Sequence, residues 1–254
     1  LKDGTDTREA WISNASGDLV LVNGGNDNTP HCKITLFDGN IQSTVKANPE
    51  AGFSIVAYTG NGSSSATVGH GLNAQLGMLI HKRRDAAASW KIKHTSLATN
   101  HQLLFTSAAS VDVTGLHGGG LADLSSSSTF GFAQGLTNVD NVNGNNVAYI
   151  NYCFAPVAGF SAFGSYVGNG STDGRFIYTG FRPRWVMLKN RGASYSWYIY
   201  DTSRDTYNVM YNVMIPNTAN ADTIDPDYSI DVLSNGFKCR TNNVRSNASG
   251  NTYI

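Results

Sequence analysis

The chain has 254 residues, and its 18 Lys and Arg residues balance 18 Asp and Glu residues, so the formal net charge is zero. Charged residues make up only 14% of the sequence, against roughly a quarter in typical globular proteins. The balanced charge excludes a general electrostatic attraction to nucleic acid or to an anionic membrane surface, and no apolar run approaches the roughly 20 residues of a membrane-spanning helix.

The residue types favour strands over helices. The chain contains 27 Gly, 12 Tyr and 11 Phe, together with many Val, Ile and Thr residues, which suit short strands joined by tight turns. Glutamate, a good helix former, occurs only as Glu9 and Glu50. We therefore predict an all-β protein.

Residues 1–51 contain two strand-like stretches, "DLVLVNGG" and "CKITLFDGN", followed by a polar segment. They precede the first recognisable repeated landmark. We interpret them as an N-terminal arm or the end of an upstream unit.

A first unit is predicted over residues 52–158. Its strand signals are the alternation that starts at Phe53, the short apolar run Met78 to Ile80, and the alternation from Trp90 to Lys93. Residues 106–146 are rich in Gly and Ser, and we expect mostly loop there, with a short strand near Phe130 to Phe132. The run "YINYCFAPV" closes the unit.

A second unit is predicted over residues 159–254, because the same landmarks recur in the same order. "YTGNGS" at Tyr58 returns as "YVGNGS" at Tyr166, and "ASWKIKH" returns as "YSWYIYD", which places Trp197 opposite Trp90. The recurrence indicates a tandem duplication with a unit of roughly 105 residues. Turn signals between short strands favour a jelly-roll-like β-sandwich for each unit.

Two further expectations follow from this alignment. Asn61-Gly62 and Asn169-Gly170 are typical of type I′ turns, so each is expected to cap a hairpin. The strand that begins "AYI" in the first unit has its counterpart at the last residue, Ile254, so we expect the natural polypeptide to continue beyond it. Residues 207–215 predict one further strand, with Tyr207, Val209, Tyr211, Val213 and Ile215 on one face and Asn208, Met210, Asn212 and Met214 on the other.

No catalytic residue is predicted, and no cofactor. "GFSAFG" lacks the spacing of a nucleophile elbow. The acidic stretch "DTIDPDYSID" could supply paired carboxylates for glycoside hydrolysis, or oxygen ligands for calcium. We interpret it as a solvated turn and retain Asp222, Asp225 and Asp227 only as weak metal candidates.

Aromatic residues are the best candidates for binding. Trp185, Trp197, Tyr198 and Tyr200 could form a platform that stacks on sugars, or a contact between subunits. For Trp197 a core role is the favoured alternative, because Trp90 occupies the corresponding place in the first unit. Tyr198 and Tyr200 replace Lys91 and Lys93, so they are better candidates for a specific surface.

Three stretches carry a resemblance to a known family: "KANPEAGFSIVAYTGNGSSSATVGHGL", "YINYCFAPVAGFSAFGSYVGNGSTDGRFIYTGFRPRWVMLKNRGASYSWYIYD" and "LSNGFKCRTNNVRSNASGNTYI". Over residues 45–254 the chain resembles a repeat-containing domain family of bacteriophage virion proteins, found in phages of marine and other aquatic bacteria. That family has no catalytic motif to transfer. The resemblance implies an extracellular component of the virion surface, either a tail-fibre module or a capsid-decorating one.

The expected function is therefore that of a non-enzymatic phage structural and adhesive protein. The expected partners are copies of the chain itself, with a trimer favoured, other virion proteins, and a cell-surface glycan as a candidate receptor. The alternatives are a capsid decoration protein, or a secreted bacterial protein that binds or degrades carbohydrate.

Overall fold

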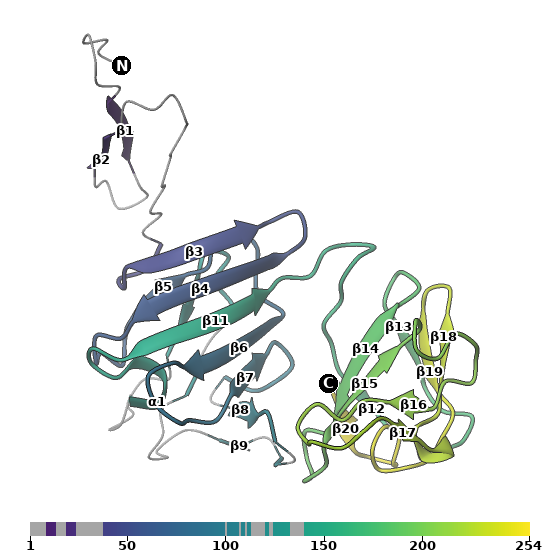
Figure 1. Cartoon of the computed structure of the whole chain (residues 1–254). Helices are drawn as coiled ribbons and strands as arrows, with labels where there is room; N and C mark the ends of the chain where they lie inside the picture. The colour runs from purple at the N-terminus through teal and green to yellow at the C-terminus, as the bar shows by residue number, and fades with distance from the viewer. Residues whose placement is uncertain are drawn as a thin grey trace.

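The computed structural model describes residues 9–13, 19–23, 38–99, 101–106, 108–109, 111–112, 120–121, 124–132 and 140–254. Figure 1 shows a chain built from strands and connecting turns, which confirms the all-β prediction. In this part of the chain no helix is long and apolar enough to span a bilayer.

The expected N-terminal arm is described only in part. Strands β1 (Glu9–Ser13) and β2 (Leu19–Asn23) pair as an antiparallel hairpin. Strand β3 (Ser43–Asn48) also precedes residue 52, but it pairs with β4 and belongs to the main sheet of the first unit. Residues 1–8, 14–18 and 24–37 of the arm lie outside the described residues.

The first unit is organised around a seven-stranded antiparallel sheet with the order β3-β4-β11-β6-β7-β8-β9. Strand β11, third in this order, pairs with β4 on one side and with β6 on the other. Besides β3, the strands are β4 (Phe53–Thr59), β6 (Met78–Arg83), β7 (Lys91–His94), β8 (His101–Leu104), β9 (Val111–Asp112) and β11 (Ala148–Phe154).

Burial alternates with a period of two residues along the strands of this sheet. In β4 the side chains of Ser54, Val56 and Tyr58 are buried, and the intervening ones are only half-buried. Strand β11 follows the same pattern, with Tyr149 and Cys153 buried. Alternating residues of a strand point to opposite faces, so the sheet has an inner face toward the core and a more exposed outer face.

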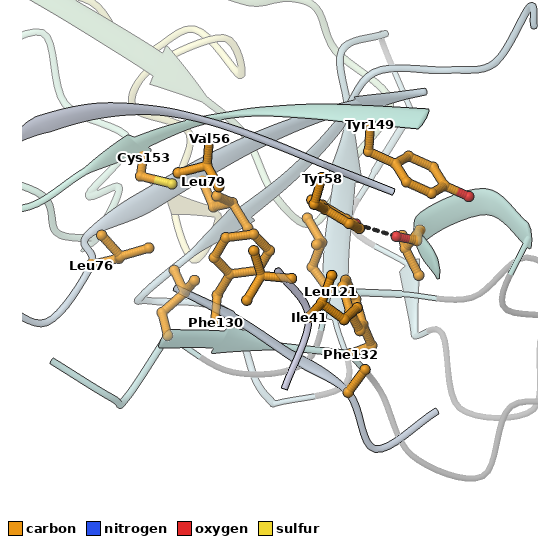
Figure 2. Close-up of a cluster of buried hydrophobic side chains, with 14 of the residues drawn as sticks. Ile41, Val56, Tyr58, Leu76, Leu79, Leu121, Phe130, Phe132, Tyr149 and Cys153 are labelled. Atoms are coloured by element: carbon orange, nitrogen blue, oxygen red, sulfur yellow. Dashed lines mark hydrogen bonds between the residues drawn. The ribbon is translucent and has the colours of Figure 1, made fainter. Parts of the chain in front are cut away.

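A two-stranded layer covers the inner face. It consists of β5 (Thr67–Gly69) and β10 (Thr129–Gly131), which pair with each other. Figure 2 shows Val56, Leu79 and Cys153 of the large sheet facing Phe130 across the core. The short strand expected near Phe130 is therefore confirmed, and the apolar contact between the layers stabilises the unit.

A short helix, α1 (Asp140–Asn143), leads into β11. The hydroxyl of Tyr58 donates to the carbonyl oxygen of Val142, as the dashed line in Figure 2 marks. This contact ties the helix to the inner face of the sheet.

The second unit distributes its strands over smaller sheets. Strand β12 pairs with β20, β13 with β19, β18 also with β19, β14 with β15, and β16 with β17. The jelly-roll-like sandwich and the tandem repeat thus stay predictions. The bounds are β12 (Tyr166–Val167), β13 (Phe176–Tyr178), β14 (Trp185–Lys189), β15 (Trp197–Asp201), β16 (Asn212–Val213), β17 (Thr223–Ile224), β18 (Ile230–Leu233), β19 (Gly236–Cys239) and β20 (Thr252–Tyr253), with a 3₁₀ turn, η1, over Pro226–Tyr228.

The strand predicted over residues 207–215 is wrong except at β16. Tyr207 and Tyr211 are exposed, but Val213, expected on the same face, is fully buried. The carboxylate of Asp205 accepts hydrogen bonds from the backbone N–H groups of Tyr211 and Asn212, at 2.8 and 3.1 Å. These two hydrogen bonds turn the chain before β16, so the alternating pattern does not continue as one strand from Tyr207 to Val213.

The two units meet through a third apolar cluster. Ile92 and Leu103 of the first unit pack with Trp197 and Ile254 of the second. The indole Nε1 of Trp197 donates to the carbonyl oxygen of Leu104 at 3.1 Å, and its ring stacks on Phe105. The interface therefore lies on the outer face of the large sheet, at the β7–β8 side.

Candidate functional site

The repeated Gly-Asn-Gly-Ser turn of the second unit is held by the buried side chain of Asn247. Its Nδ2 donates to Oδ1 of Asn169 and to the carbonyl oxygens of Ser171 and Thr241, at 2.8, 2.8 and 3.0 Å. Its Oδ1 accepts the backbone N–H of Asn169 at 3.1 Å. One amide thus clamps a turn that lies 78 residues away in sequence; we name this arrangement the asparagine clasp.

A tyrosine pair accompanies the clasp. The rings of Tyr166 and Tyr253 stack with centroids 5.1 Å apart. The hydroxyl of Tyr166 donates to Ser246 O at 2.7 Å, and the hydroxyl of Tyr253 accepts the N–H of Ala248 at 2.9 Å. Both side chains therefore fix the backbone on either side of Asn247.

The first unit contains the same arrangement. Nδ2 of Asn143 donates to Asn61 Oδ1 and Ser63 O at 2.9 and 2.7 Å, and Asn143 Oδ1 accepts the N–H of Asn61. The rings of Tyr58 and Tyr149 also stack with centroids 5.1 Å apart. The two repeated turns are therefore held by the same set of contacts, residue by residue, whereas the tandem duplication itself stays a prediction.

The prediction that these turns cap hairpins is wrong. Thr59 ends β4, and the chain then enters β5, which pairs with β10 and not with β4. Only Gly62 and Gly170 of the two Asn-Gly pairs have positive φ, at 74° and 68°, whereas a type I′ turn needs both residues there. Asn143 and Asn247, which the sequence analysis missed, hold the turns instead. Their only sequence signal is that Asn143 precedes Tyr149 by the same number of residues as Asn247 precedes Tyr253.

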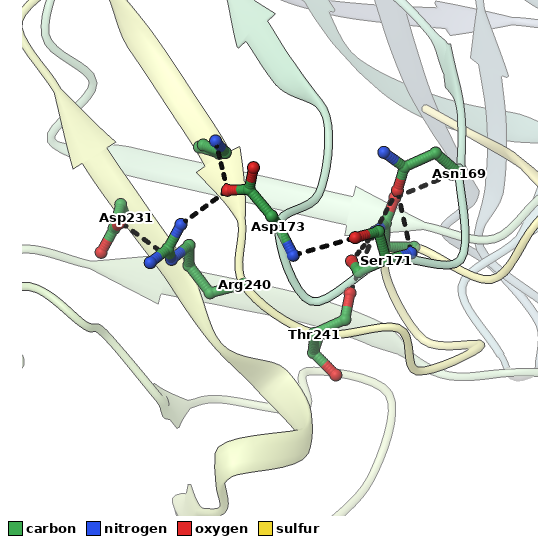
Figure 3. A network of polar contacts seen from close by, with 8 residues as sticks. Asn169, Ser171, Asp173, Asp231, Arg240 and Thr241 are labelled. Carbon is green, nitrogen blue, oxygen red and sulfur yellow. Dashed lines mark hydrogen bonds and ion pairs between the residues drawn. The ribbon is translucent and has the colours of Figure 1, made fainter.

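Charged side chains flank the clasp of the second unit (Figure 3). Asp173 Oδ1 contacts Lys238 Nζ at 2.6 Å and Arg240 Nη1 at 3.1 Å, and Arg240 Nε contacts Asp231 at 3.2 Å. The hydrogen bond from Lys238, followed by the charge of Arg240, lowers the pKa of Asp173. The network joins the turn to β18 and β19.

The acidic stretch does not form one site. Asp222 pairs with Arg204, whereas the Oδ1 atom of Asp225 accepts the N–H of Asp227 and caps η1. Asp227 Oδ2 contacts Asn243 and Arg245 at 2.8 and 3.2 Å. The weak metal candidates are thus engaged separately, and the described residues contain no group of three His, Cys, Asp or Glu side chains able to hold a metal ion.

Three of the four predicted contact residues are buried. Trp197 is 2% exposed at the interface between the units, and Tyr198 and Tyr200 are 3% and 1% exposed in the core of the second unit. The expectation that the two tyrosines form a surface is therefore wrong, because the covered face of β15 is the one that carries them. Of the four, Trp185 alone is exposed, at 51%.

Trp185 stands at the base of an exposed loop. It is the cross-strand partner of Asp201, after which the chain forms the segment 202–225, which includes the short strands β16 and β17 and is here called the display loop. The loop exposes large apolar side chains, namely Tyr207, Val209, Tyr211 and Ile224. Trp185, which pairs with the residue that precedes the loop, and the exposed side chains of the display loop are here called the aromatic surface of the second unit.

Polar contacts hold the display loop in place. Arg204 pairs with Asp222 across it, and the N–H of Thr202 donates to Arg184 O at 2.9 Å. Met210 is buried and exchanges backbone hydrogen bonds with Ile230 of β18, at 2.8 and 2.9 Å. The exposed side chains therefore stand on a fixed backbone, which reduces the entropy cost of binding.

The comparison with protein families identifies the chain. Residues 14–254 match a family described as a domain of unknown function, DUF7483. The chain belongs to this DUF7483 family. No curated protein and no solved structure matches it. For this DUF7483 domain, function must therefore be argued from the geometry above.

Proposed function

We propose that this DUF7483 domain is a non-enzymatic structural and adhesive protein of a phage virion surface. In this proposal the aromatic surface of the second unit makes the functional contact. The resemblance to phage virion proteins supports the location, and the exposed aromatic surface supports the role.

The observation that carries the proposal is the exposure of Trp185, Tyr207 and Tyr211, at 51%, 83% and 41%, on a braced loop. Large aromatic side chains left in water cost free energy that a partner can recover. Flat rings with a polar edge suit either the face of a sugar or a neighbouring subunit.

A glycan-degrading enzyme is less well supported. Hydrolysis of a glycosidic bond requires two carboxyl groups about 5 to 10 Å apart that face one substrate. Asp222 and Asp227 instead bind their own arginines, Arg204 and Arg245. A binding module that uses aromatic side chains needs no such pair.

The proposal is tested on purified chain with glycan arrays and with light scattering of its oligomeric state. The double variant Trp185→Ala, Tyr207→Ala removes two exposed rings. The matched control is Phe160→Ala, because Phe160 is 64% exposed but lies outside the aromatic surface. We expect the double variant, and not the control, to abolish glycan binding or self-association.

A monomer that binds no glycan, or equal behaviour of the variant and the control, would refute the contact role of the aromatic surface. The location is tested separately by cryo-electron microscopy of the native particle. Density for this fold on a tail appendage or capsid supports the virion proposal, and a particle that lacks it contradicts the proposal.

A further inference from the structure

The outer face of the first unit carries a groove that the proposed function does not use. It has a volume of about 580 Å³, and its walls include Asn40, Gln42, Thr44, Asn61 and Arg84. It lies at the β3–β4 side of the sheet, whereas the second unit packs against the β7–β8 side.

The strand register builds the floor of the groove. Thr44 of β3 is the partner of Ala57 in β4, and Thr59 of β4 is the partner of Ala148 in β11. Arg84 follows β6, and its N–H donates to Ala148 O at 2.9 Å. Because Ser43 and Tyr58 are buried on the inner face, their neighbours Thr44, Ala57 and Thr59 lie on the outer one.

Amide groups supply donors at one end of the groove. Asn61 Oδ1 accepts hydrogen bonds from Ser63 N and Asn143 Nδ2, and Asn40 Oδ1 accepts one from Thr67 N at 2.7 Å. Within the part of the chain that the structure describes, this leaves the Nδ2 hydrogens of Asn40 and Asn61 as donors for a ligand. Asn143, the first-unit counterpart of Asn247, thus also orients the Asn61 side chain at the groove.

The charge on this face is positive although the whole chain is neutral. Lys46 lies on the same face as Thr44, because the two are separated by one residue in β3. Lys82 also lies on this face, because it pairs with Ile150, and Ile150 pairs with Ala57. None of the residues that β3, β4, β11 and β6 place on this face is acidic. The carboxylate of Asp85, next to Arg84, is held by Arg83 at 2.6 Å.

An aromatic ring lies beside Lys82 on the same face. Trp90 is 40% exposed, and Lys82 Nζ lies 5.6 Å from its ring centroid. The ring stacks on Tyr152, whose side chain lies on the same outer face. A fixed and partly exposed indole is a surface on which a sugar ring can stack.

We infer that this outer-face groove binds an acidic polysaccharide. Arg84 and Lys46 would pair with carboxylate or sulfate groups, the Asn, Gln and Thr side chains would bond sugar hydroxyls, and Trp90 would stack on a ring. Arg84 lines the groove, and Lys46 and Lys82 lie elsewhere on the same face. Such sparse positive charge with amides beside it suits a polyhydroxylated anion better than the denser phosphate charge of nucleic acid. The site is separate from the aromatic surface and does not depend on a virion location.

The test measures binding of the full chain to four probes by calorimetry: polygalacturonate, dextran sulfate, neutral dextran and a single-stranded oligonucleotide. We expect at least one acidic polysaccharide to bind about ten times more tightly than neutral dextran. We also expect added salt to weaken the binding of that polysaccharide. Binding of polygalacturonate alone assigns carboxylate as the recognised group, and binding of dextran sulfate alone assigns sulfate. Failure of both, or tighter binding of the oligonucleotide, overturns the inference.

Variants locate the site. Arg84→Gln should weaken binding about tenfold, whereas Arg182→Gln, which removes an exposed arginine of the second unit, should not. Equal melting temperatures of the two variants establish that both are folded. Equal affinities would overturn the inference. Loss of binding in the Trp185→Ala, Tyr207→Ala double variant would also overturn the inference, because that result would place the binding site on the aromatic surface.

Discussion

The buried amide of Asn247 illustrates how much one side chain can organise in this molecule. Its replacement by Ala removes the hydrogen bonds to Asn169, Ser171 and Thr241, and Thr241, which is buried, loses a partner for its carbonyl oxygen. We expect Asn247→Ala to lower the free energy of unfolding by about 3 kcal/mol, measured by urea denaturation. Asn220→Ala, at an exposed position, is the control and should change it by less than about 0.5 kcal/mol.

The stability of the fold in acid should depend on the buried side chain of His94. Burial lowers the pKa of His94 to about 4, and its Nδ1 accepts the N–H of Ser96 at 3.1 Å, which requires the unprotonated ring. The unfolded chain takes up this proton below its ordinary pKa of about 6.5, whereas the folded chain takes it up only near 4. Folding stability should therefore fall as the pH decreases from 6.5 to 4, by about 3 kcal/mol from this group.

The measurement for His94 is chemical denaturation of wild type and His94→Asn across this pH range. The asparagine keeps an acceptor for Ser96 but does not titrate. The variant should lose less stability on acidification than wild type. Parallel pH profiles would show that His94 does not cause the loss.

At the scale of elements, close backbone approach decides where the short strands of the second unit can meet. The N–H of Gly168 donates to Asn251 O at 2.9 Å, which continues the pairing of β12 with β20. A Cβ atom on Gly168 would lie 2.2 Å from Ala248 O, a distance that no side chain tolerates. The glycine of the repeated turn is thus required by the neighbouring segment.

Gly168→Ala should therefore destabilise the chain by about 2 kcal/mol or more, and urea denaturation measures this directly. Gly164→Ala is the matched control, because a Cβ there has no neighbouring atom within 4 Å and φ is not positive. The control should be neutral or slightly stabilising. Equal destabilisation by both substitutions would contradict the close-approach argument.

For the whole molecule, the interface around Trp197 decides whether the units unfold together. Trp197→Ala removes the stacking on Phe105 and the bond to Leu104, and opens a cavity between the units. We expect a loss of about 3 to 5 kcal/mol and a calorimetric transition that broadens or splits in two. Trp185→Ala, at an exposed site, should retain the wild-type transition.

Much of the strand layout could be predicted from sequence. The alternation from Phe53, the apolar run at Met78 and the pattern from Trp90 each fall on an observed strand. The recurrence of the Tyr-x-Gly-Asn-Gly-Ser stretch also marks two places with the same contacts. These features are local, because side-chain period and turn composition act over a few residues.

The candidate sites depended on contacts that local patterns cannot specify. Alternation separates the faces of β15 but does not say which is covered, so Tyr198 and Tyr200 were misplaced on the surface. The partner of Asn61 lies 82 residues away, and the groove joins strands from both ends of the first unit. Composition and side-chain period are sufficient to predict the all-β class and most strand positions. Which aromatic side chains stay exposed and which polar groups converge depends on the complete fold, because burial depends on what packs over each face.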